Sequence, residues 1–398
     1  MGVNTLATLL IMQAFGAYFV HFQEEFGWRK ATVAGAFSMG QIIIAVIAPF
    51  LGGLVDRLGS RVMATTGVVV LSGGVVGLSF VQNLPQMYVA FFCIFLGSAQ
   101  CGWVTLNAAA ANWFRRRRTM ALGMVGVGSS IGGLMLPIVA LSLDAFGWRH
   151  TAFGSGVALL VLGVPLARMV RDRPEAYGLT PDGEAASEAG QRTGRAVDEG
   201  DFTLREALRT SAFWYIAIGH GSASLIIATV SVHLIPHLVE RIQMSVELAS
   251  VMVLLMTAFT ICGQVLGSYL GTRVESRLLA TVGLAGHVVG MLVLAFGTNI
   301  GWVVVFALIH GLSWGLRGPI MSSIRAEYFG PSALGAILGV SMTLLAAGNI
   351  IAPLLAGYMA DRAGNYQLAF VVMGVVGGVG SAFFLLAKKP VRPARRAV

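Results

Sequence analysis

Charged residues are scarce in this sequence. Only 11% of the 398 residues are Asp, Glu, Lys or Arg, whereas 56% are hydrophobic. A soluble globular domain typically carries about 25% charged residues. The chain therefore has too few charges to cover a water-exposed surface, which argues against a soluble enzyme and indicates an integral membrane protein.

Several patterns that carry chemistry are also missing. The three cysteines, Cys93, Cys101 and Cys262, lie in apolar runs without CxxC spacing or a His/Cys cluster. We expect free thiols, no structural metal and no cofactor. The sequence has no GxxxxGK[ST] or HExxH motif and no pair of acids inside an apolar run. ATP-driven transport and enzymatic catalysis are therefore both disfavoured.

Long apolar runs are what the sequence does contain. A spanning helix needs roughly 20 apolar residues, and we predict twelve such helices, at 3–22, 31–55, 62–81, 86–112, 119–141, 148–169, 211–237, 247–271, 278–297, 300–323, 333–359 and 366–387. The first run lacks a basic n-region and is expected to be a retained span, although a natural start upstream of Met1 stays open.

The only long hydrophilic stretch divides the twelve spans into two groups of six. We therefore predict an all-α integral membrane protein with an N-terminal six-helix bundle (1–170), a cytoplasmic central loop (171–209) and a C-terminal six-helix bundle with a short basic tail (210–398).

The net charge of +9 is best interpreted as a topology signal. With both termini and the central loop in the cytoplasm, most of the 27 basic residues fall on that side, Arg325 among them. We predict a multi-pass plasma (inner) membrane protein with both termini cytoplasmic and no nucleic-acid partner. The run Arg115–Arg118 is expected to anchor this topology, with anionic lipid headgroups as a second possible contact.

The two halves resemble each other in sequence. Ala111-Asn112-Trp113-Phe114 matches Ala326-Glu327-Tyr328-Phe329 at an offset of 215, and Leu136-Pro137-Ile138-Val139-Ala140 matches Ala352-Pro353-Leu354-Leu355-Ala356 at an offset of 216. This pattern is typical of a diverged duplication. Two like-oriented bundles related by an axis along the membrane normal predict a binding site between them.

A cytoplasmic loop carries a more specific motif. The segment Gly52-Gly53-Leu54-Val55-Asp56-Arg57-Leu58-Gly59-Ser60-Arg61 resembles the signature of the major facilitator superfamily between spans 2 and 3, and Leu266–Arg273 is a degraded copy without the aspartate. The resemblance implies that Gly52, Asp56, Arg57 and Arg61 take part in gating. Retention of topology by positive charge is the alternative.

Two further segments resemble a narrower branch. Glu25-Phe26-Gly27-Trp28-Arg29 and Arg173–Gly183 are similar to segments of the monocarboxylate transporter and oxalate:formate antiporter branch. This resemblance implies a small organic anion as substrate, moved with a proton or in exchange for another anion. A cationic residue is common on span 8 in that branch, and this sequence has none there.

Arg317 is the only basic residue deep in a predicted span. A charge near the bilayer centre costs about 2.5–3.5 kcal/mol on insertion scales, and no predicted span interior carries an acid. We therefore predict that the guanidinium binds the carboxylate of the substrate, because its planar fork suits bidentate recognition. Bonding to backbone carbonyls, or snorkelling towards the cytoplasm, is the alternative.

Further substrate-binding candidates surround this residue in the prediction. Helical spacing places His310, Ser313, Trp314 and Arg317 on one face of span 10, and Gln100, Trp103 and Asn107 on one face of span 4. Polar residues on other spans that the resemblance assigns to the cavity are Gln13, Tyr18, Gln41, His220, Gln264 and Asn349. Ordinary interhelical packing is the alternative for each.

These observations predict a secondary active transporter of a small organic anion that works by alternating access. Proton symport is the first choice for coupling and anion exchange the second, and His220, His310 or the anion itself is the candidate proton carrier. An exporter of neutral or drug-like compounds, or a non-transporting sensor or channel, is the alternative function.

Overall fold

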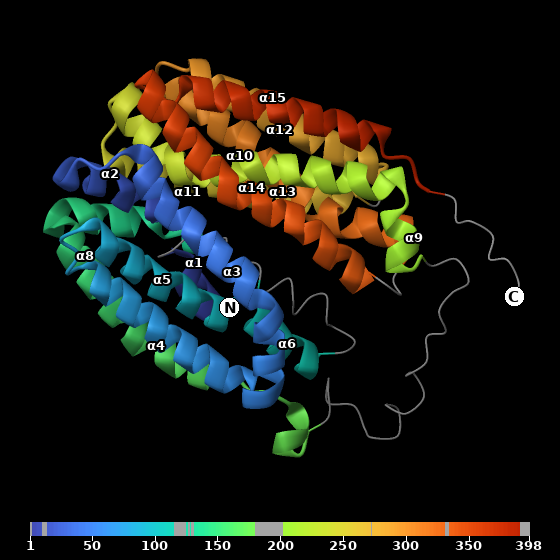
Figure 1. Cartoon of the computed structure of the whole chain (residues 1–398), viewed down its shortest axis with the longest axis horizontal. Coiled ribbons are helices and arrows are strands. Elements are labelled where there is room, and N and C mark those ends of the chain that lie inside the picture. The colour runs from blue at the N-terminus through green and yellow to red at the C-terminus, as the bar shows by residue number, and fades with distance from the viewer. Residues whose placement is uncertain are drawn as a thin grey trace, which may run out of the picture. The chain divides into compact units, whose positions relative to one another are not determined.

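The computed structural model describes residues 2–9, 14–114, 125, 128, 131–179, 202–271, 273–330 and 334–390. Throughout these residues helix is the only regular secondary structure (Figure 1). The chain forms two compact units, one of Met1–Thr193 with Ser231–Leu254, the other of Gly194–Val230 with Leu255–Val398.

The first unit contains the helices of the N-terminal half. They are α1 (Gly2–Thr8), α2 (Phe15–Phe26), α3 (Lys30–Leu58), α4 (Ser60–Leu78), α5 (Leu84–Cys101), α6 (Trp103–Trp113) and α8 (Leu136–Arg168), followed by the short 3-10 helix η2 (Pro174–Tyr177). Local sequence explains several boundaries. The side chain of Asn83 caps α5 by accepting the N–H of Gln86 at 3.1 Å, and Pro85 occupies the first turn.

A glycine turn separates two predicted spans within α8. Gly147 has φ 74° and ψ 162°, which is not helical, so α8 consists of two helical segments on either side of it. Glycine adopts such a positive φ without a steric cost from Cβ. The turn falls between the predicted spans 119–141 and 148–169.

A second glycine breaks the predicted fourth span. Gly102 has φ −89° and ψ −144° between α5 and α6, and a side chain there would lie 2.5 Å from the carbonyl oxygen of Ser98. The predicted fourth span is supported as one apolar segment, Leu84–Ala110, but its helix is interrupted at Gly102. Helical spacing therefore does not place Gln100 on the same face as Trp103 and Asn107.

The second unit contains the helices of the C-terminal half. They are α9 (Leu204–Leu208), α10 (Ser211–Ile242), α11 (Val246–Leu270), α12 (Ser276–Phe296), α13 (Ile300–Phe329), α14 (Leu334–Ala363) and α15 (Gln367–Leu386). The C-terminal part of α10 and the N-terminal part of α11, Ser231–Leu254, belong to the first unit. The domain boundaries predicted from the sequence stay a prediction.

Among the described residues, ten helices are long and apolar enough to cross a membrane. The two remaining predicted spans, 3–22 and 119–141, include residues outside the described ranges. Gln13 and the run Arg115–Arg118 also lie outside the described ranges, so the predictions made for them stay predictions.

Equivalent hydrogen bonds support the duplication. In the first unit Nε1 of Trp113 donates to the carbonyl of Arg171 at 2.9 Å. In the second unit the hydroxyl of Tyr328 donates to the carbonyl of Ala387 at 2.8 Å. Trp113 and Tyr328 are equivalent in the repeat proposed from sequence. Each unit therefore joins the end of its fourth predicted span to the chain at or just after the end of its sixth.

Candidate functional site

Arg317 is buried in the middle part of α13 in the second unit. Its side chain leaves the residue only 4% exposed, and its Nε and Nη1 atoms are buried without a hydrogen-bond partner among the described residues. An unpaired buried cation is costly, because desolvation removes its interaction with water. The structure thus confirms that Arg317 is buried and shows that the Nε and Nη1 donors of its guanidinium have no partner among the described residues.

Three glycines on α12 allow the polar face of α13 to approach closely. A Cβ on Gly283 would lie 3.4 Å from Cβ of Arg317, and one on Gly290 would lie 3.3 Å from Cβ of His310. A Cβ on Gly286 would lie 2.0 Å from Oγ of Ser313. Small residues permit such close helix contact in membranes. His310 and Ser313 therefore contact α12.

His310 contacts a histidine that the sequence reasoning missed. Nδ1 of His310 lies 3.1 Å from Nδ1 of His287 on α12, and the ring centroids are 4.4 Å apart. Both side chains are fully buried, and both Nε2 atoms are without a partner among the described residues. The sequence feature that could have identified His287 is its position as the single histidine in the apolar run 278–297.

Arg325 is a second buried cation on α13, and its burial was not predicted from the sequence. It is 1% exposed. Its Nη1 donates to the carbonyl of Met321 at 2.6 Å, and its Nη2 lies 2.6 Å from Oγ of Ser341 and 3.0 Å from Nδ1 of His220. Helix α13 continues to Phe329, beyond the predicted end of the span at 323, so Arg325 is still part of the helix; its predicted place on the cytoplasmic side stays a prediction.

The contact with Arg325 determines the protonation state of His220. Arginine is a donor only, so Nδ1 of His220 must accept the hydrogen bond. His220 is then a neutral imidazole whose proton is on Nε2. Nearby, Oγ of Ser224 donates to the carbonyl of Leu345 at 3.1 Å, which also joins α10 to α14.

The other predicted residues of the second unit are less buried. Trp314, Gln264 and Asn349 are all half-buried. The ring of Trp314 lies 6.1 Å from that of His310, edge to face. Their predicted contacts with substrate are not tested by these positions and stay predictions.

The candidates of the first unit are described within that unit alone. Tyr18 and Gln41 are buried, at 4% and 8% exposed. Oε1 of Gln100 and Oδ1 of Asn107 are buried without a partner among the described residues. The side chain of Trp103, like the whole of Gln13, lies outside what the structure describes. Substrate binding by these residues stays a prediction.

The proposed gating loop is joined to the chain after α8. Asp172 Oδ1 accepts the backbone N–H of Arg61 at 2.8 Å, and Nε of Arg61 donates to the carbonyl of Val170 at 3.1 Å. Gly59 has φ 85°, and a Cβ there would lie 2.7 Å from the carboxylate of Asp172.

The rest of the motif lies at the C-terminal end of α3. Gly52, Asp56 and Arg57 belong to its last turns; Arg57 is exposed, and the side chain of Asp56 is not described. Asp172 therefore caps the start of α4, whereas the gating role of the motif stays a prediction.

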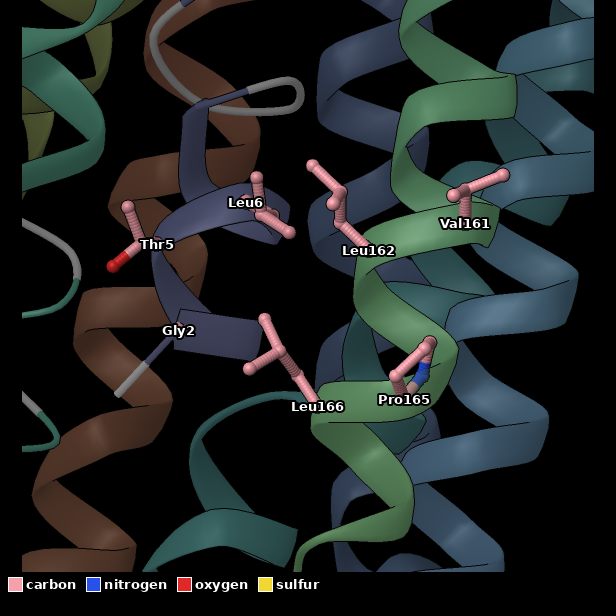
Figure 2. Close-up of a pocket in the computed structure, with 7 residues that line it drawn as sticks. All are labelled: Gly2, Thr5, Leu6, Val161, Leu162, Pro165 and Leu166. Carbon is pink, nitrogen blue, oxygen red and sulfur yellow. The ribbon is translucent and has the colours of Figure 1, made fainter.

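A cavity in the first unit has a different chemistry. About 460 Å³ in volume, it is lined by Gly2, Thr5, Leu6, Val161, Leu162, Pro165 and Leu166 (Figure 2). None of the predicted site residues lines it, and Thr5 supplies its only polar side chain. An apolar lining of this kind does not suit a small anion.

Comparison with known proteins establishes the class of this protein. The fold is similar to that of a bacterial homologue of the human lysosomal transporter Spinster, in an inward-facing and unoccupied conformation. The two structures superpose with a TM-score of 0.76 at 14% sequence identity, and the match covers 97% of this chain and 94% of that chain. The model of the Major Facilitator Superfamily matches residues 1–316 and, in a second match, 216–398. The chain belongs to the Major Facilitator Superfamily and is a multi-pass membrane transporter, not an enzyme.

Within this superfamily the chain is similar to monocarboxylate transporters. Monocarboxylate transporter 11 of Mus musculus is 25% identical over 376 residues, which cover 91% of this chain and 80% of the relative. Monocarboxylate transporter 10 of Danio rerio is 25% identical over 384 residues, which cover 94% of this chain and 73% of the relative. The resemblance inferred from the sequence segments is therefore confirmed.

Proposed function

We propose that this protein is a secondary active transporter of a small organic anion, in the first place a monocarboxylate, and that Arg317 binds the carboxylate. The observation that carries this proposal is the burial of the guanidinium with Nε and Nη1 unpaired among the described residues. A carboxylate is the natural partner for such a group, because two parallel N–H···O bonds fit the planar fork.

The protein supplies no acid that competes for this role in the described part of the second unit. Its acidic residues there are Glu206, Glu275, Glu327 and Asp361, and all lie at or near helix ends. Arg325 differs from Arg317 because its donors are already used by Met321, Ser341 and His220. Arg317 is therefore the cation that needs an external anion.

The similarity to monocarboxylate transporters supports the same substrate class. We place the protein in the plasma (inner) membrane with both termini cytoplasmic, where it exposes the bound anion alternately to each side. Proton symport is the preferred coupling, and anion exchange is the second choice. The motif Gly52, Asp56, Arg57 and Arg61 is assigned to the conformational switch.

A ligand-induced thermal shift tests the substrate class. The purified, detergent-solubilised protein is screened against pyruvate, butyrate, benzoate, succinate, glucose, an amino acid and a cationic dye. The screen is repeated with Arg317→Gln and with Arg205→Gln, a control at an exposed arginine of α9. We expect stabilisation by a monocarboxylate in the wild type and the control that is lost in Arg317→Gln.

Other outcomes would overturn the proposal. Stabilisation only by neutral or cationic compounds would give Arg317 a structural role and favour an exporter. Stabilisation by a carboxylate that persists unchanged in a folded Arg317→Gln protein would show that the anion binds elsewhere.

A further inference from the structure

The hydrogen bond between His287 and His310 requires a different tautomer of each ring. Their Nδ1 atoms are 3.1 Å apart, so one ring must carry its proton on Nδ1 and donate it, while the other accepts. The donor ring then has a lone pair on Nε2, and the acceptor ring has a proton on Nε2. Both Nε2 atoms are buried without a partner among the described residues.

The hydrogen-bonded pair of histidines can bind only one additional proton without losing the hydrogen bond. A proton added to the free Nε2 of the donor ring makes an imidazolium that still donates from Nδ1, so the hydrogen bond between the rings is kept. A second proton would need to be placed on the accepting Nδ1, which would break the bond and set two cations side by side. The pair is therefore a monoprotic site.

The charges that act on this pair are few. Among the described residues, Arg317 is the charged side chain whose field acts on both histidines. It lies seven residues, or two helical turns, after His310 on α13. Arg325 in turn acts on Arg317.

The helices packed around the pair add no compensating acid near it. α15 has no charged residue or histidine, and α11 has only Glu247, in its first turn. α14 has Asp361 and Arg362 in its last turn, and α12 has Arg277 near its start. Glu327 lies close to the end of α13 and accepts a hydrogen bond from Ser276.

We propose that His287 and His310 together form the proton-binding site of this transporter and that Arg317 couples it to the anion. This inference rests on the proposed function. With Arg317 unpaired, its positive charge opposes protonation of the pair. A carboxylate bound to Arg317 neutralises that charge, so the proton and the anion bind cooperatively, each raising the affinity for the other by the same factor. The proposal predicts one proton carried with each anion.

His220 is a poorer proton site by the same reasoning. Its Nδ1 already accepts from Arg325 at 3.0 Å. Protonation of that nitrogen would remove the acceptor, and protonation of either nitrogen places a positive charge against a permanent cation. His220 therefore stays neutral and holds Arg325 in place.

Proton uptake on anion binding tests the proposal. The monocarboxylate from the panel of pyruvate, butyrate and benzoate that binds most tightly is titrated into purified protein by calorimetry, in buffers of different ionisation enthalpy. The wild type is expected to take up about one proton per anion. His310→Gln and His287→Asn are expected to bind the anion with proton uptake near zero. His150→Gln, at an exposed histidine of α8, serves as the control and is expected to behave as the wild type.

Each contrary result has its own meaning. If the wild type binds the anion through Arg317 without taking up a proton, the proton site is wrong and the anion carrier stands. The same holds if folded His287 and His310 variants still take up one proton. If no monocarboxylate binds, or if Arg317→Gln binds it unchanged, the proposed function itself fails. Wild-type uptake near zero overturns the proton site without any variant, and where one histidine variant does not fold, the other tests which residues take up the proton.

Discussion

Nη2 of Arg325 lies 3.0 Å from Nδ1 of His220 and donates a hydrogen bond to it. Because Nη2 also lies 2.6 Å from Oγ of Ser341, one guanidinium joins α10, α13 and α14. Charge-assisted hydrogen bonds of this kind are among the stronger ones in proteins. Arg325 is therefore expected to stabilise the packing of the second unit, whereas Arg317 is the residue that we propose binds a ligand.

The first prediction concerns this contact. Arg325→Gln shortens the side chain and leaves His220 and Ser341 without their buried donor, which should lower stability by about 1–3 kcal/mol. The measurement is the thermal unfolding midpoint in detergent. Arg205→Gln, at an exposed position, should change it little. Equal midpoints for both variants would show that the buried contact contributes nothing to stability.

The second prediction concerns two glycines three residues apart on α13. A Cβ on Gly315 would lie 2.0 Å from the carbonyl oxygen of Thr260 and 2.6 Å from the backbone nitrogen of Gln264, whereas one on Gly318 meets nothing within 4 Å. Gly315→Ala must push α11 and α13 apart and should destabilise the protein by about 1–3 kcal/mol. Gly318→Ala is the matched control and should be neutral or slightly stabilising. The same detergent unfolding assay compares the two, and a larger loss in Gly318→Ala would contradict the observed packing.

The third prediction concerns the cap on α4. Asp172→Ala removes the acceptor of the Arg61 N–H and should cost about 0.5–2 kcal/mol, as for other helix N-caps. Asp172→Asn retains an acceptor oxygen and should cost less. Asp144→Ala, at an exposed aspartate of α8, is the control. If Asp172→Asn and Asp172→Ala lower the stability of the protein equally, the charge of Asp172 rather than its hydrogen bond stabilises the start of α4.

The fourth prediction is a pH dependence at the end of α2. Arg149 forms an ion pair with Glu25, and Nε1 of Trp148 donates to the same carboxylate at 2.6 Å. The hydrogen bond from Arg149 holds the pKa of Glu25 below its ordinary value of 4.5. A carboxyl group whose pKa is lowered by folding contributes stability above the unfolded pKa, and that contribution disappears as the pH falls through the folded pKa.

Unfolding midpoints of the wild type and Glu25→Gln should therefore differ at pH 7 and converge as the pH is lowered below about 4.5. A difference that is constant from pH 7 to pH 4 would show that the charge of Glu25 has no part in holding α2 to the segment after Gly147. Because the carboxylate is partly exposed, the effect should also shrink at high salt.

The fold could be predicted from the sequence to a large extent, because local patterns determine it. Apolar run length placed α11 and α12 within a few residues of their observed ends. The burial of Arg317 also followed from its position deep in an apolar run.

The missed features depend on contacts between helices. The burial of Arg325 could not be predicted from its place after an apolar run, because it depends on Ser341 and His220, which come from two other helices. The contact between His287 and His310 depends on the close approach of α12 and α13 that the glycines of α12 permit, so it could not be predicted from the position of His287 in the sequence. The break at Gly102 is a single backbone conformation, and one glycine in an apolar run does not reveal it.

Transport by reconstituted protein is the most direct test of the central claim. Uptake of the radiolabelled monocarboxylate selected by the thermal-shift screen is measured in proteoliposomes with an imposed proton gradient, for the wild type, Arg317→Lys, Arg317→Gln and Arg205→Gln. We predict saturable uptake by the wild type and by the Arg205→Gln control. Arg317→Lys should bind the monocarboxylate with a weaker affinity, because lysine cannot form the bidentate fork. Arg317→Gln should show no uptake above empty liposomes. Uptake by Arg317→Gln with wild-type affinity would contradict the assignment of Arg317 as the anion-binding residue.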